Sequence, residues 1–205
     1  DFGAVMDDHL LEAEQSLAKF AMGVEKIKIN HDVPLRIKTI LETQALKTEA
    51  NIRKACRIAL KYSDILKMVS GFPVARDNDA KGRGTLSAAR IMLEEILYFY
   101  QRTGILRGIK ITGAINEWDN SAHPDSSAIN YYKLVLQVLG RHLGAHYIFE
   151  RDLFRIGGYN SLSNFTSVVR VKDCPYQSRL IPFEPANYRY LGIPITEETS
   201  SLHID

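Results

Sequence analysis

The sequence predicts an α/β protein in which parallel strands alternate with amphipathic helices. Short apolar segments that run into glycine turns alternate with longer segments whose apolar residues recur every three or four positions. Thr48 and Thr85 stand where two of the helices would begin, and a threonine hydroxyl is a good acceptor for the free backbone N–H groups of a first helical turn. The alternation implies βα units around a parallel sheet.

The predicted elements follow one another along the first three quarters of the chain. The predicted strands are 1–6, 35–43, 64–69, 109–112 and 153–156. The predicted helices are 9–21 with Asp8 as its cap, 48–62, one that begins at Thr85, and 128–139. The segment 170–205 holds four prolines and three tyrosines and has little helical period, so it is either a mobile terminus or an extended tail lying on the protein or on a partner.

Composition excludes several classes of function. The 205 residues carry a net charge of +2 without a run of basic residues, so neither a nucleic-acid partner nor a membrane surface is expected. The longest apolar segment, 91–100, is interrupted by Glu94 and Glu95 and is too short to cross a bilayer. The isolated Cys56 and Cys174 suggest reduced thiols and a cytoplasmic location.

Two lysines in short apolar strands are the strongest indication of chemistry. Lys67 lies in the segment Ile-Leu-Lys-Met-Val, and Lys110 lies in Gly-Ile-Lys-Ile-Thr. Burial disfavours an ammonium, and a second cation nearby lowers the lysine pKa further, so one of the pair could act as a neutral amine nucleophile. The alternative is that both are ordinary lysines whose charged ends reach solvent from the strand ends.

Six segments, in this order, resemble the deoxyribose-phosphate aldolases. They are 36–46, 52–56, 65–71, 87–92, 109–115 and 153–158, similar to the family's strands five to eight and the helices between them. The resemblance implies a TIM (β/α)8 barrel with only strands four to eight present. Residues 1–169 would be the C-terminal part of that barrel, with 170–205 as an extended tail. Because the chain opens inside the presumed strand four, we expect the first strands to be missing.

The resemblance also implies roles for individual residues. Lys67 would form the Schiff base, Lys110 would lower its pKa, and Asp1 would transfer protons with a bound water. Strand alternation would place Lys67 and Lys110 inside the barrel, with Lys38 and Glu42 as supporting residues. It would leave Leu66, Met68, Ile109 and Ile111 facing the helices. The residues expected to bind substrate and phosphate are Ser70, Gly71, Gly113, Ala114, Gly157, Gly158 and Asn160.

The expected activity is cleavage of 2-deoxy-D-ribose 5-phosphate to acetaldehyde and D-glyceraldehyde 3-phosphate, with no cofactor and no metal. The phosphate motifs depart from the family pattern, because Gly113 is followed by alanine and the family's serines are absent after Gly157. A catalytically weak or inactive scaffold protein is therefore the alternative. The expected partner is a small phosphorylated sugar. A homodimer is a further expectation, and so is a protein partner for the tail. His142 and His146 have helical spacing but no third ligand nearby, which favours packing over metal binding.

Overall fold

The computed structural model describes residues 5, 7–70, 84–112, 128–144 and 154–156. Its helices are α2 (Leu10–His31), α3 (Thr43–Leu46), α4 (Glu49–Tyr62), α5 (Leu86–Thr103), α6 (Ala128–Val135) and α7 (Arg141–Leu143), with the π-helical segment η2 (Leu136–Gly140) between the last two. Its strands are β1 (Lys38–Ile40), β2 (Ile65–Lys67), β3 (Gly108–Ile111) and β4 (Phe154–Ile156).

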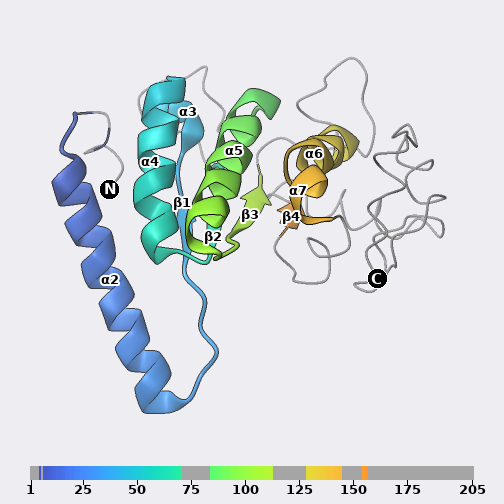
Figure 1. The fold of residues 1–205 in the computed structure, drawn as a ribbon. Coiled ribbons are helices and arrows are strands. Elements are labelled where there is room, and N and C mark those ends of the chain that lie inside the picture. The colour runs from blue at the N-terminus through green and yellow to red at the C-terminus, as the bar shows by residue number, and fades with distance from the viewer. Residues whose placement is uncertain (1–4, 6, 71–83, 113–127, 145–153, 157–205) are drawn as a thin grey trace.

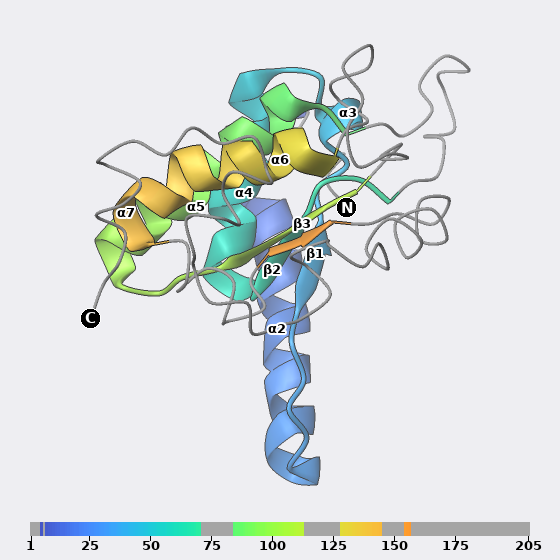
Figure 2. The same ribbon diagram turned by 90° about the vertical axis from the view of Figure 1, so that its right-hand side faces the viewer.

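The four described strands form one parallel sheet in the order β1-β2-β3-β4. Each strand is therefore followed by its neighbour on the same side, and successive crossovers of one hand place their helices on one face of the sheet. Helices α4, α5, α6 and α7 do lie to one side of the strands (Figure 2). The prediction of parallel βα units is confirmed, whereas a closed barrel is not seen in the described part of the chain.

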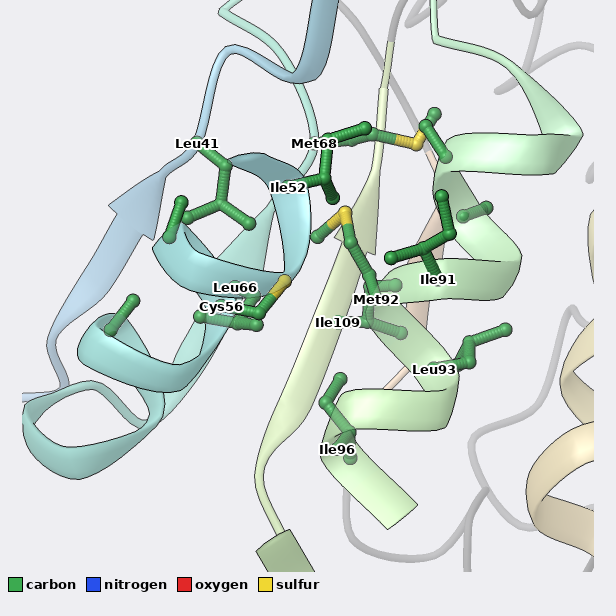
Figure 3. Packing of buried hydrophobic residues seen from close by; sticks show 14 of the residues in the cluster. Leu41, Ile52, Cys56, Leu66, Met68, Ile91, Met92, Leu93, Ile96 and Ile109 are labelled. Carbon is green, nitrogen blue, oxygen red and sulfur yellow. The ribbon is translucent and has the colours of Figure 1, made fainter. Parts of the chain in front are cut away.

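The hydrophobic core lies between this sheet and helices α4 and α5. Leu66, Met68, Ile109 and Ile111 point from the strands into the core, and each is at most 1% exposed. Cys56 on α4 and Met92 and Ile96 on α5 pack against them (Figure 3). The sheet face that carries these apolar residues is the one predicted from strand alternation. Burial raises the pKa of the Cys56 thiol, so this cysteine serves as a core residue.

The two threonine caps predicted from the sequence are present. The Thr48 hydroxyl accepts the Asn51 N–H at 3.2 Å and begins α4. The Thr85 hydroxyl accepts the Ala88 N–H at 3.1 Å and begins α5, which ends at Gly104 in a left-handed conformation with φ 70°. These local signals fix the start of both core helices independently of the rest of the fold.

Gly84 lets the start of α5 approach the carboxyl end of β3 closely. A Cβ atom at this position would come within 2.5 Å of the Thr112 carbonyl oxygen and would also clash with the Met68 side chain. The Tyr131 hydroxyl donates to the Gly84 carbonyl at 3.3 Å from the next helix along. Only glycine therefore allows these three elements to meet as they do.

The buried Glu95 of α5 binds two arginines of α4 and so links the two helices. Its side chain is 3% exposed, and it accepts hydrogen bonds from Arg53 at 3.1 Å and from Arg57 at 2.8 and 3.0 Å. Arg53 also binds Glu94 at 2.6 Å and Glu49 at 2.7 Å. The hydrogen bonds to Glu94 and Glu49 hold the pKa of Arg53 above its usual value, so Arg53 stays charged.

Several predicted element boundaries are wrong. The first long helix runs to His31 rather than ending near residue 21, and no side chain caps its start, so Asp8 is not its cap. Its second half extends beyond the other described elements (Figure 1). Val5 is helical and buried, where a strand was expected. β1 and β2 are shorter than predicted, at three residues each, whereas β3 has the predicted four residues but begins one position earlier.

Physical reasons account for two of these differences. Between Met22 and His31 the sequence has no proline, and Lys28 pairs with Glu25 one turn earlier, so nothing stops the helix until Asp32 adopts a left-handed conformation. β1 ends early because Glu42 has positive φ and Thr43–Leu46 turns into the short helix α3.

Candidate active site

Lys67 and Lys110 are neighbours in the sheet. The register of β2 and β3 pairs Lys67 directly with Lys110, on the face opposite the helices. Their chain neighbours Leu66, Met68 and Ile109 are buried in the core, while both lysines are partly exposed. The register therefore brings together the two lysines singled out in the sequence, at the carboxyl ends of two adjacent parallel strands.

The Lys67 amine lies in a partly dehydrated and cationic environment. Its Nζ donates to the Ser70 carbonyl oxygen at 3.3 Å. Burial lowers the pKa of Lys67, the positive charge of Lys38 lowers it further, and the negative charge of Glu42 opposes both. A larger fraction of neutral amine is therefore present at neutral pH than for a lysine in water.

Lys38 and Glu42 both belong to the strand next to Lys67. Lys38 begins β1 and is exposed, and β1 pairs with β2 so that Ile40 lies opposite Lys67. Glu42 follows the end of β1, and its Oε1 accepts the Ser70 N–H at 2.7 Å. Both residues predicted to support the site thus act electrostatically on Lys67.

The segment after β2 is held from both sides. Glu42 binds the Ser70 N–H, and the buried Thr112 donates through its hydroxyl to the Val69 carbonyl at 2.6 Å. These contacts fix the Val69–Ser70 backbone relative to β1 and β3. Because the Ser70 carbonyl is the acceptor for Lys67, they also restrict where the Lys67 amine lies.

A further cationic position was not singled out in the sequence. The register of β3 and β4 places Arg155 beside Lys110, so Lys67, Lys110 and Arg155 occupy adjacent positions on three parallel strands. The sequence showed only the position of each residue within its own strand. The register of the strands is needed to see that the three residues are neighbours.

The remaining predicted site residues lie outside the described part of the chain. They are Asp1, Gly71, Gly113, Ala114, Gly157, Gly158 and Asn160. Their roles stay predictions, as does the separate tail 170–205. Within the described residues, no group of three or more histidine, cysteine, aspartate or glutamate side chains could hold a metal ion. No described helix has both the length and the apolar character that crossing a bilayer requires.

No protein-family model matches the sequence. Functional inference therefore depends on the geometry around Lys67 and on the sequence motifs themselves.

Proposed function

We propose that the protein is a class I aldolase of the deoxyribose-phosphate aldolase kind, with Lys67 as the Schiff-base nucleophile. The observation that carries this proposal is the direct pairing of Lys67 with Lys110 across two parallel strands. The pKa of Lys67 is lowered mainly by burial, which favours the neutral amine that attack on a carbonyl requires. The two amines thus belong to paired strand positions, and one of them is partly buried, which distinguishes them from two separate surface lysines.

In the proposed reaction, the neutral Lys67 Nζ attacks the C1 carbonyl of open-chain 2-deoxy-D-ribose 5-phosphate. One of the two amine protons passes from the nitrogen to the former carbonyl oxygen, a second proton reaches that oxygen from solvent, and the oxygen leaves as water, which gives a protonated imine that keeps one N–H. The C3 hydroxyl then loses its proton and becomes the aldehyde of D-glyceraldehyde 3-phosphate as the C2–C3 bond breaks. The electron pair of that bond passes into an enamine, which is protonated at C2. Hydrolysis of the resulting imine releases acetaldehyde and restores Lys67.

We also propose that the four-stranded sheet is a sector of a (β/α)8 barrel. All the described strands are parallel and sequential, and the helices after β1, β2 and β3 lie on one face. In such a barrel the active site lies at the carboxyl ends of the strands, where Lys67 and Lys110 precede their loops. Asp1 would then be the proton-transfer residue, and the phosphate would be held by Gly113, Ala114, Gly157, Gly158 and Asn160. The buried free thiol of Cys56 is compatible with the cytoplasmic location that we propose.

The test is acetaldehyde release from 2-deoxy-D-ribose 5-phosphate by the purified protein, measured by coupled reduction of the aldehyde. We expect turnover, with a smaller preference for the phosphorylated over the unphosphorylated sugar than intact phosphate motifs would give. The lost serine contacts account for this, because each hydrogen bond to a charged group contributes about 1.5–3 kcal/mol. No turnover with either sugar would contradict the proposal and would favour a non-catalytic scaffold.

A further inference from the structure

Glu42 has a backbone conformation that non-glycine residues rarely adopt. Its φ of 52° and ψ of 57° are left-handed, directly after the last residues of β1. Such a conformation costs on the order of 1 kcal/mol or more for a residue with a Cβ atom, and it persists only where other contacts hold it. Glycine would adopt this conformation without the strain.

The two carboxylate oxygens of Glu42 have different surroundings. Oε1 accepts the Ser70 N–H at 2.7 Å. Oε2 is buried and has no hydrogen-bond donor among the described residues. Leaving a buried acceptor without a donor costs roughly 1–3 kcal/mol. A strained backbone and an unsatisfied oxygen in one residue indicate that stability alone does not explain its presence.

Ser70 connects Glu42 to the lysine. Its N–H donates to Glu42 Oε1, and its carbonyl oxygen accepts from Lys67 Nζ at 3.3 Å. Glu42 and Lys67 do not form an ion pair with each other within the described structure, yet the carboxylate acts electrostatically on the amine. The charged groups that face Lys67 come from both neighbouring strands: Lys38 and Glu42 from the β1 side and Lys110 from β3.

We propose that Glu42 is the positioning residue for Lys67: through Ser70 it fixes where the amine lies, and its carboxylate balances the cations around that amine. This inference rests on the proposed function, in which Lys67 is the nucleophile. It assigns Glu42 a role through another residue rather than direct contact with the reacting atoms.

Two substitutions separate the two parts of this role. Glu42→Gln keeps an oxygen that can accept the Ser70 N–H but removes the negative charge. Because that charge raises the pKa of Lys67, we expect the pH midpoint of Lys67 reactivity to shift to lower pH. Glu42→Gly relieves the backbone strain but removes the anchor of Ser70. We expect a folded protein of similar or greater stability in which imine formation at high pH slows on the order of 10- to 100-fold.

The measurement is competitive acetylation of Lys67 by acetic anhydride across a pH series, read by peptide mass spectrometry, with borohydride trapping of acetaldehyde on the same variants. Glu25→Gln on α2 is the matched control, because it removes the same charge from a side chain that is 59% exposed. An acetylation midpoint in Glu42→Gln equal to that of the wild type would overturn the proposal. Unchanged trapping in a folded Glu42→Gly variant would do so as well. If the wild-type protein forms no imine, the proposed function fails. The acetylation midpoints still show whether the Glu42 carboxylate raises the pKa of Lys67.

Discussion

Lys67→Met should reduce acetaldehyde release to background while leaving the fold intact. Methionine has a similar length but no amine, and no Schiff base can form without one. The Lys67 side chain is partly exposed and its amine donates to the Ser70 carbonyl oxygen, so loss of the charge should not destabilise the core. Lys19→Met is the control, because Lys19 is an exposed lysine on α2 remote from the sheet. Residual turnover in Lys67→Met above background would show that another residue is the nucleophile.

The cations around Lys67 should add to the effect of burial on the pH at which the reaction begins. Lys38 lowers the pKa of Lys67, so Lys38→Met should raise that pKa and move the rise in activity to higher pH. The position of Lys110 in register with Lys67 leads us to expect the same direction for Lys110→Met. Activity near neutral pH would fall in both variants because less neutral amine is present. An unchanged profile in both would mean that charge repulsion has no part in activating Lys67.

Glu95→Gln should destabilise the interface between α4 and α5. Glu95 is 3% exposed and accepts three hydrogen bonds from Arg53 and Arg57, and an amide lacks both the charge and one acceptor oxygen. We expect a loss of roughly 2–3 kcal/mol in the free energy of unfolding, measured by urea titration. The matched control is Glu94→Gln, because Glu94 binds the same Arg53 but is 40% exposed. It should cost less than about 1 kcal/mol. Equal effects of the two substitutions would contradict this account of the helix interface.

Local sequence signals predicted the core of the fold well. Thr48 and Thr85 marked the starts of α4 and α5 because a capping hydroxyl acts within three residues of itself. The face on which Lys67 and Lys110 lie followed from strand alternation, since Leu66 and Ile109 had to point toward the helices. Both inferences depend only on neighbours in the chain.

Other features depend on contacts between distant segments and could not be predicted. The left-handed conformation of Glu42, which ends β1, is held by a hydrogen bond to Ser70 28 positions later. The influence of Lys38 on Lys67 requires the register of β1 and β2, and the row that ends at Arg155 requires that of β3 and β4. The Glu95 cluster likewise joins residues of two helices, although the spacing of Arg53 and Arg57 by one helical turn was a visible signal.

The most direct test of the central claim is borohydride reduction of the purified protein in the presence of acetaldehyde, followed by peptide mass spectrometry. A Schiff base on Lys67 would be reduced to a stable N-ethyl lysine, and the adduct should be found on the peptide that contains Lys67. Its yield should rise at a lower pH than for exposed lysines, because the pKa of Lys67 is lowered. An ethyl group spread over surface lysines, or none on Lys67 at any pH, would contradict the proposal that this lysine is an aldolase nucleophile.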